Sequence, residues 1–229
     1  MNPIILDEIQ FKPDFDALAS VLRIRKDGKD EKRLMDLLDQ SLSVAKPKGA
    51  YTESFVDEIE NDYVTIDGVR LNGKLLPVNL KNVTRVFPYL ATCGTELEEW
   101  SGGIEGIRER FWVDTIMMFA LGSAIGEIDR HIEKNSNPGA RSAMNPGSLE
   151  EWPIEEQQGL FRILGNSHSI IGVKLTESFM MSPLKSVSGI FFPSEHSYEN
   201  CRLCRREKCP GRRAPFDASL REGFFNEPH

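Results

Sequence analysis

The stretch from 172 to 192, GVKLTESFMMSPLKSVSGIFF, changes its hydrophobic period within twenty-one residues. Its first half is an apolar segment that polar residues interrupt and that Pro183 ends. Val187, Gly189 and Phe191 then alternate with other residues, which is the period of a strand. The pattern predicts a short helix or turn that delivers the chain into a buried strand.

Two amphipathic helices are predicted near the N-terminus. Over 13–25 and 30–45, apolar residues recur at steps of three and four, which places them on one helix face. Pro13 and Asp14 suit the first positions of one helix, and Pro47 ends the other. Core packing is a sufficient role for both.

The hydrophobic period falls to two between residues 50 and 92. Asp67-Gly68 separates two short apolar runs and supplies the positive φ values of a tight turn, which predicts a hairpin. The segment 85–92, RVFPYLAT, predicts another strand. Pro88 cannot donate a hydrogen bond to a neighbouring strand, so this strand is expected at a sheet edge or at a bulge.

The longest predicted helix runs from 109 to 134. Its apolar residues form one stripe at steps of three and four: Val113, Ile116, Ala120, Ala124, Ile128 and Ile132. Gly122 and Gly126 interrupt its middle, and each costs about 1 kcal/mol relative to alanine. We therefore expect another backbone to pass close to these glycines.

Composition excludes several classes of function. A net charge of −7 argues against nucleic acid as the main partner, because phosphate binding needs a basic face. The longest apolar run, 116–121, is too short to cross a bilayer, and the N-terminus lacks the basic start and apolar core of a signal peptide. These features predict a cytoplasmic chain without a membrane partner. Dinucleotide, Walker, HExxH and serine-elbow motifs do not occur.

Three cysteines, Cys201, Cys204 and Cys209, lie within CRLCRREKCP near the C-terminus. Thiolates so close together favour soft metals, because metal binding offsets the cost of crowding deprotonated sulfurs. Their spacing suits an iron–sulfur cluster or a zinc knuckle. Free thiols are the alternative interpretation.

A fourth metal ligand is needed, and several cations surround the cysteines. Cys93 is the candidate ligand, with His196 or His229 as substitutes. The basic residues, set against the single acid Glu207, are Arg202, Arg205, Arg206, Lys208, Arg212 and Arg213. This excess of positive charge could balance a thiolate-ligated cluster, dock an acidic protein, or be a simple basic tail.

The run KLTESF at 174–179, followed by Met and Pro and then by SVSG at 186–189, resembles the reactivation domain of cobalamin-dependent methionine synthase. In that family the domain binds S-adenosylmethionine and re-methylates oxidised cobalamin, with an electron from a reductase partner. The resemblance covers about 85–200 in order. It implies an α+β fold, a single mixed domain in which a twisted antiparallel sheet is packed with helices and a long central helix.

Three segments are expected within this domain. Residues 1–84 form the N-terminal helices and the hairpin-rich part, residues 85–200 form the activation-like core, and residues 201–229 form a cysteine-rich basic tail.

The segment 141–153, RSAMNPGSLEEWP, resembles the loop in which the family holds S-adenosylmethionine with an Arg and with the Tyr of Pro-Gly-Tyr. A guanidinium pairs with both oxygens of a carboxylate, and a backbone can approach closely beside Gly. This chain keeps Pro146-Gly147, but Ser148 stands in place of Tyr. Arg141 lies two residues further from Pro-Gly than the family Arg, and Ala143 occupies the position of that Arg.

The resemblance implies a ligand site with a carboxylate from the long helix, the loop residues and a tyrosine beyond the aromatic strand. Its candidate residues are Glu127, Arg141, Asn145, Gly147, Ser148 and Tyr198.

Two functions remain open at this point. The first is a stand-alone reactivation protein that binds S-adenosylmethionine and serves a corrinoid-dependent methyltransferase whose cobalamin is carried by the partner. The second is a docking or electron-transfer module that bears an iron–sulfur cluster or zinc and binds a corrinoid protein without methyl transfer.

Overall fold

The computed structural model describes residues 2–194, 198–209 and 212–226, and antiparallel pairing joins the strands of its main sheet. The eight strands of this sheet are β1 (Ile4–Leu6), β2 (Lys48–Tyr51), β3 (Ser54–Ile59), β4 (Tyr63–Ile66), β5 (Val69–Asn72), β6 (Arg85–Thr92), β7 (Arg141–Met144) and β10 (Ser186–Pro193). A separate two-stranded sheet joins β8 (Lys174–Leu175) to β9 (Met181–Ser182). Both sheets contribute to the site described below.

Strand β6 lies at the centre of the main sheet. It pairs with β10 along one side and with β2 and then β3 along the other. The expected edge position of Pro88 is therefore wrong. The nitrogen and the carbonyl of Pro88 both face the junction between β2 and β3. There the carbonyl accepts a hydrogen bond from Thr52 N–H at 3.1 Å. A break in the neighbouring ladder thus accommodates a proline in a central strand.

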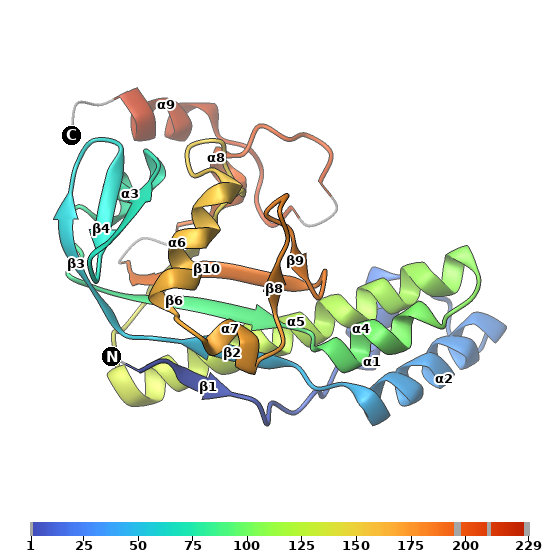
Figure 1. Ribbon diagram of the computed structural model, residues 1–229. Coiled ribbons are helices and arrows are strands. Elements are labelled where there is room, and N and C mark those ends of the chain that lie inside the picture. The colour runs from blue at the N-terminus through green and yellow to red at the C-terminus, as the bar shows by residue number, and fades with distance from the viewer. Residues whose placement is uncertain (1, 195–197, 210–211, 227–229) are drawn as a thin grey trace.

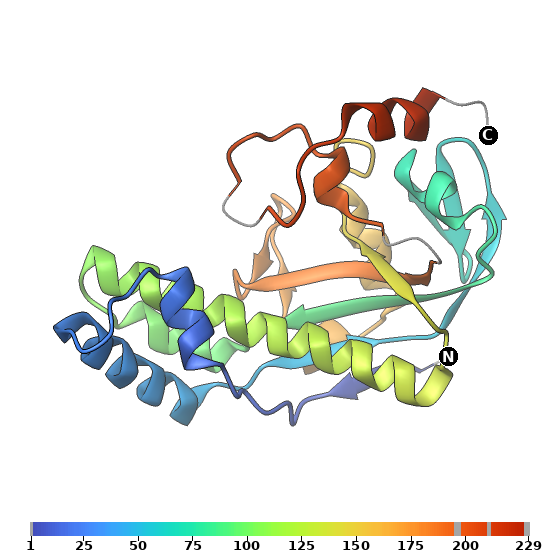
Figure 2. The ribbon, with the colours of Figure 1, turned by 180° about the vertical axis from the view of Figure 1, so that it is seen from behind.

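Helices cover both faces of the sheet. They are α1 (Phe15–Val21), α2 (Lys29–Val44), α3 (Leu75–Leu80), α4 (Thr95–Gly102), α5 (Ile107–Ser136), the 3₁₀ helix η1 (Ile154–Glu156), α6 (Gln157–Ile163), α7 (Ser167–Ile170), α8 (Asn200–Leu203) and α9 (Ala218–Asn226). Helix α6 lies on one face of the sheet (Figure 1), and α5 crosses the other (Figure 2). Beyond the sheet, α1, α2 and α4 pack around the first half of α5 as a helical lobe.

Helix α5 confirms the predicted long helix, and its apolar stripe is buried. Among the described residues it is also the helix long and apolar enough to cross a membrane by length and composition. Its stripe instead packs on the sheet and in the helical lobe, as in the core helix of a globular protein. The expected backbone contact at Gly122 and Gly126 is wrong, because a Cβ added at either glycine would meet no atom within 4 Å.

Local patterns elsewhere are confirmed. Strands β4 and β5 form the predicted hairpin, and Asp67 and Gly68 both have positive φ at its turn. In the 172–192 stretch the β8–β9 hairpin comes first, and a bend at 183–185, with no helix, then delivers the chain into β10. The predicted α+β fold, with its twisted antiparallel sheet and long central helix, is therefore confirmed.

Candidate functional site

Strand β10 has an open edge along its first half. It pairs with β6 from Ser186 to Phe191, but with β7 only from Ile190 to Pro193. A cleft of about 290 Å³ lies along the part of β10 that β7 leaves uncovered. We call it the edge cleft. Its lining residues are 145–148, Ile154, Gln157, 179–181, Leu184 and 186–188.

The Pro-Gly turn forms one wall of the edge cleft. Gly147 has φ +77°, a conformation that favours glycine, and its N–H donates to Trp152 O at 2.8 Å. Ser148 N–H donates to Asn145 O at 3.2 Å and closes the turn. A Cβ at position 147 would lie 3.0 Å from Ile154 Cβ. The turn can therefore pack tightly against the start of η1 because it contains glycine.

Asn145 fastens this turn to the edge of β10. Its Nδ2 donates to Ser188 O at 2.8 Å and to Tyr89 Oη at 2.8 Å. Gly189 makes room for the amide, because a Cβ there would lie 2.3 Å from Asn145 Nδ2. Burial raises the pKa of Tyr89 to about 12, so its hydroxyl stays protonated at neutral pH. Asn145 thus acts as a fixed part of the wall.

The opposite wall is tied to the sheet through Gln157 of α6. Gln157 Nε2 donates to Phe179 O at 2.6 Å, and Ser188 Oγ donates to Gln157 Oε1 at 3.2 Å. Phe179 has φ +60°, an uncommon conformation for a bulky residue, in the loop between β8 and β9. One amide therefore joins the helix, the β8–β9 hairpin and β10 around the cleft.

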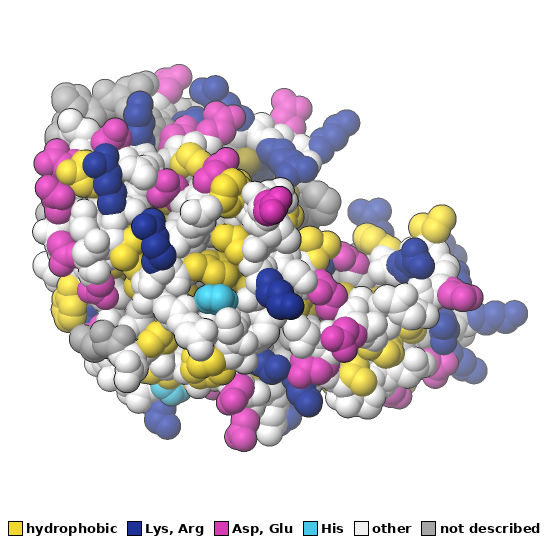
Figure 3. All heavy atoms as spheres, viewed as in Figure 1, with side chains coloured by type: hydrophobic (Ala, Val, Ile, Leu, Met, Phe, Trp, Pro, Cys, Tyr) yellow, Lys and Arg dark blue, Asp and Glu magenta, His cyan; other side chains and the backbone are white. Residues whose placement is uncertain are grey.

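The lining of the edge cleft carries no charged side chain among the described residues. Its mouth has exposed apolar side chains, since Met180 is 47% and Leu184 is 59% exposed. In Figure 3, hydrophobic side chains gather near the middle of this face, between α6 and the β8–β9 hairpin, with charged side chains around them. The cleft therefore offers neutral polar groups and apolar surface.

Comparisons with known proteins point to the same part of the chain. Residues 130–209 match the family described as vitamin B12 dependent methionine synthase, activation domain. All thirteen residues that line the edge cleft lie within this segment. In fold, the chain is similar to a crystal structure of the MetH reactivation domain bound to AdoHcy. The TM-score is 0.62 and the identity 16%, over 87% of this chain and 81% of that chain. No curated protein sequence matches the chain.

The resemblance to the methionine synthase activation domain is thereby confirmed. It holds for the matched segment in sequence and for most of the chain in fold. The structure brings three of the candidate residues, Asn145, Gly147 and Ser148, to the edge cleft. It places Glu127, Arg141 and Tyr198 elsewhere.

Arg141, the arginine of the 141–153 segment, points away from the edge cleft. Its side chain is 8% exposed and lies against α5, where Nε donates to Asp129 Oδ1 at 2.9 Å and an ion pair joins it to Glu133. Burial alone would lower the pKa of its guanidinium, but these two carboxylates outweigh burial and raise it. Arg141 therefore fastens β7 to α5.

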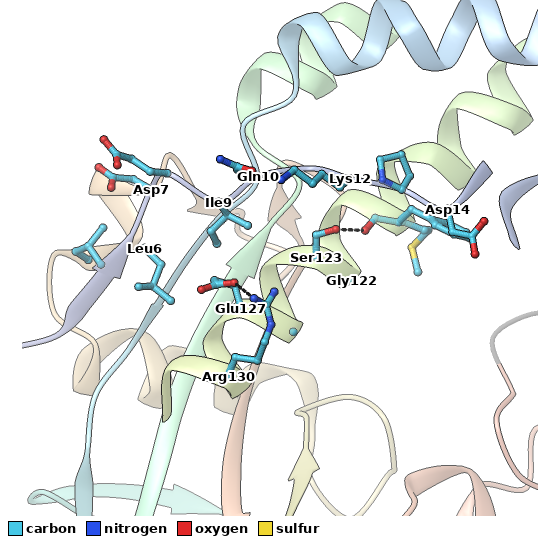
Figure 4. A pocket seen from close by; sticks show the side chains of 16 residues that line it. Leu6, Asp7, Ile9, Gln10, Lys12, Asp14, Gly122, Ser123, Glu127 and Arg130 are labelled. Carbon is cyan, nitrogen blue, oxygen red and sulfur yellow. Dashed lines mark hydrogen bonds and ion pairs between the residues drawn. The ribbon is translucent and has the colours of Figure 1, made fainter. Parts of the chain in front are cut away.

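Glu127 lines a different cavity, which we call the α5 groove, with a volume of about 1100 Å³. One wall consists of residues 5–10 and 12–14, and the other is the α5 face of Met118, Phe119, Gly122, Ser123, Gly126, Glu127 and Arg130. Glu127 pairs with Arg130 at 2.5 Å (Figure 4). The groove forms where Gly122 and Gly126 leave space.

Tyr198 belongs to the core beneath the C-terminal helices. Its ring packs with Phe192 and Phe224, and its hydroxyl donates to Asn200 Oδ1 at 2.6 Å. Burial raises its pKa far above the usual range, so the phenol stays protonated. The structure therefore gives Tyr198 a packing role at the base of the tail.

The proposed metal set is not assembled. In the parts of the chain that the structure describes, there is no group of three His, Cys, Asp or Glu side chains that could hold a metal ion. Cys93 is fully buried in the helical lobe, where burial raises its pKa to about 12, whereas Cys204 packs against the core on the α6 side of the sheet. His196 and His229 lie outside the described residues. The thiols at 93, 201, 204 and 209 are free.

The guanidinium of Arg212 fastens the described part of the cysteine-rich loop, which begins at Cys201. Arg212 donates to the carbonyls of Cys201 at 2.9 Å and Cys204 at 3.0 Å, and also to Arg206 O and Ala214 O. Arg213 N–H approaches Cys201 Sγ at 3.4 Å. The close cysteine spacing is thus compatible with a loop closed by hydrogen bonds.

Several residues of the edge cleft were not identified from the sequence. Gln157, Phe179 and Ser188 join through hydrogen bonds between three separate elements, which no local pattern reveals. Phe179 and Ser188 did carry a signal, because both lie in the KLTESF and SVSG runs that carry the resemblance. Gln157 had none.

Proposed function

We propose that this chain is a reactivation partner of a corrinoid-dependent methyltransferase and takes S-adenosylmethionine in the edge cleft. The proposal rests on one observation, the overlap between the edge cleft and the segment that matches the activation-domain family. Each residue that lines the cleft lies in the segment that matches the activation domain of vitamin B12 dependent methionine synthase. A solved structure of similar fold is a MetH reactivation domain bound to AdoHcy.

When bound, S-adenosylmethionine would supply the methyl group that traps the reduced cobalt of the partner's corrinoid. The reduction is uphill, and an irreversible methyl transfer pulls it forward. The residues of this chain would bind and orient the donor. The turn at Gly147 lets backbone approach a ligand, Asn145 and Gln157 hold the two walls, and Met180 and Leu184 exclude water at the mouth.

The fit of S-adenosylmethionine to this cleft is partial. The nucleoside part is neutral and flat, and it suits a cleft of neutral polar groups and apolar side chains. The amino-acid end carries a carboxylate and an ammonium group, for which the described lining offers no charged partner. Arg141, the one arginine of the 141–153 segment, is engaged with Asp129 and Glu133.

The test is anaerobic calorimetric titration of the full chain with S-adenosylmethionine. We expect saturable binding in the micromolar range, weakened when Met180 and Leu184 are both changed to Ala. Both side chains are exposed, so the fold should be kept. The matched control changes Ile107 and Phe111 to Ala, since these are also exposed apolar residues but lie outside the cleft. Absence of binding in the unchanged protein would remove the donor from the proposal.

The second candidate function is a module that docks a corrinoid protein without methyl transfer. The uncharged lining and the engaged Arg141 favour it. Arg205, Arg206 and Lys208 are exposed on the cysteine-rich loop and suit an acidic protein or an electron-transfer partner. This function predicts no S-adenosylmethionine binding, together with association to a purified corrinoid protein that weakens as salt is raised. We place either function in the cytoplasm, where free thiols are the rule.

A further inference from the structure

We infer that the edge cleft recognises its ligand by the uncharged nucleoside and thioether portion and leaves the amino-acid end in solvent. This inference rests on the proposed function, because it takes the ligand to be S-adenosylmethionine or its product. It concerns specificity, and it departs from a loop in which a guanidinium holds the ligand carboxylate.

Charge is the first line of argument. A carboxylate or ammonium group that leaves water needs an opposite charge or several hydrogen bonds, and otherwise the transfer is costly. Not one of the thirteen lining residues can supply a charge. Arg141 and Ala143 alternate with the inward-facing Ser142 and Met144 along β7, and Ala143 packs on the α5 side of the sheet. Position 143, where the family has its Arg, carries an uncharged side chain here, and Arg141 is held by Asp129 and Glu133 on the α5 side.

Both side-chain amides of the cleft already bond to protein groups. Asn145 Nδ2 donates to two acceptors, and Gln157 uses both ends of its amide to join Phe179 to Ser188. Ser186 Oγ lies 2.9 Å from Thr92 Oγ1 and donates to Pro183 O at 2.7 Å. These groups shape the cleft and are poorly placed to replace a missing cation.

The open edge of β10 offers a different kind of recognition. Ser188 O points toward the cleft, since Asn145 Nδ2 reaches it there. In an antiparallel strand the N–H and C=O of one residue point to the same side, so the N–H of Ser188 also faces the uncovered edge. Ser188 O is already engaged by Asn145, so this N–H is the group that the strand edge offers to a ligand. An acceptor on the edge of a nucleobase would match it without any charge.

The apolar flank suits the rest of the neutral portion. Met180 and Leu184 expose apolar surface at the mouth, and Ile154 and Val187 line the interior. A methionine side chain is flexible and polarizable and adapts to a ring or a thioether. Burial of the nucleoside face and sulfur against these side chains would supply affinity that is independent of the amino-acid end.

The experiment compares AdoHcy with 5′-methylthioadenosine, which keeps the nucleoside and thioether but lacks the amino-acid end. Both are titrated into the full chain by calorimetry, with homocysteine as a third probe. We expect the two nucleosides to bind within about threefold of each other and homocysteine not to bind. A site that pairs with the carboxylate would favour AdoHcy by about tenfold or more.

The outcomes separate the inference from the proposed function. If AdoHcy binds and methylthioadenosine binds at least about tenfold more weakly, the inference is overturned and the proposed function stands. If neither nucleoside binds, both fail and the docking function remains. Arg141→Gln gives a further check, with its melting midpoint measured alongside. We expect it to leave the ratio of the two affinities unchanged, and a loss of affinity for AdoHcy alone would contradict the inference.

Discussion

The edge cleft lies along the open edge of β10, whereas the α5 groove lies between α5 and residues 5–14, and the two differ in almost every property. The groove is larger, with about 1100 Å³ against about 290 Å³ for the cleft. It is lined by four acids and two cations, whereas the cleft lining is uncharged. Hydrogen bonds from Asn145 and Gln157 fix the cleft walls, but the groove opens where two glycines lack side chains.

Volume and family match therefore single out different cavities in this molecule. Of the groove residues, only Arg130 lies in the segment that matches the activation-domain family, while all cleft residues do. The cleft is built from interlocked elements that a single added methyl group would disturb. The groove tolerates such a change, and four substitutions test this contrast.

Gly189→Ala should have the largest effect. The added Cβ would lie 2.7 Å from Met144 O and 2.3 Å from Asn145 Nδ2, and the backbone oxygen cannot easily move. We expect the free energy of unfolding to fall by about 1 to 3 kcal/mol, as for overpacked cores, with a loss of nucleoside binding. Urea denaturation and calorimetry measure the two effects. An unchanged midpoint of urea denaturation would show that the cleft wall can move to accommodate the added methyl group.

Arg141→Gln should have the next largest effect, on stability alone. It removes the ion pairs that hold β7 to α5 and leaves Asp129 and Glu133 one helical turn apart. Both carboxylates are nearly half exposed, so we expect a loss on the order of 1 kcal/mol. Thermal unfolding measures it. The control is Lys26→Gln, which removes a fully surface pair with Asp16 and should change nothing.

Gly126→Ala, in the α5 groove, should stabilise the protein rather than destabilise it. A Cβ there meets no atom within 4 Å, and alanine favours the helix. We expect the free energy of unfolding to rise by about 0.5 to 1 kcal/mol, with the affinity for S-adenosylmethionine unchanged. A fall in stability in urea denaturation would mean that the groove is occupied or packed in solution.

Glu127→Gln should have the smallest effect. The substitution removes a surface ion pair with Arg130, whose side chain is 70% exposed, so stability should change by less than about 0.5 kcal/mol. Titration with S-adenosylmethionine should give the same affinity as the unchanged protein. Weaker binding would show that Glu127 belongs to the ligand site. The two cavities could then no longer be assigned different roles.

Elements with a strong local pattern could be predicted from the sequence. The stripe of α5, the Asp67-Gly68 turn and the strand β10 were each predicted from neighbouring residues, and all three are present. The fold class followed from these elements and from the resemblance in the KLTESF and SVSG runs. Half of the candidate ligand residues reach the cleft, namely those of the Pro-Gly turn itself.

Features that depend on distant partners could not be predicted. Pro88 lies in a central strand because two different strands meet beside it, which its own neighbours do not encode. The direction of Arg141 depends on which face of the sheet α5 covers. Likewise the space at Gly126 depends on the path of the N-terminal segment. In each case the decisive atom comes from a residue far along the chain or from a neighbouring element.

The length of α5 also has a consequence for how the molecule unfolds. At about 1.5 Å per residue, its 30 residues form a rod of roughly 45 Å. The first half of the rod belongs to the core of the helical lobe and the second half to the core against the sheet. If one core unfolded alone, its half of α5 would lose the apolar side chains that shield it from water. The other core would still require the same helix to stay folded. The chain should therefore lose its structure in one cooperative transition, with α5 as the element that couples its two cores.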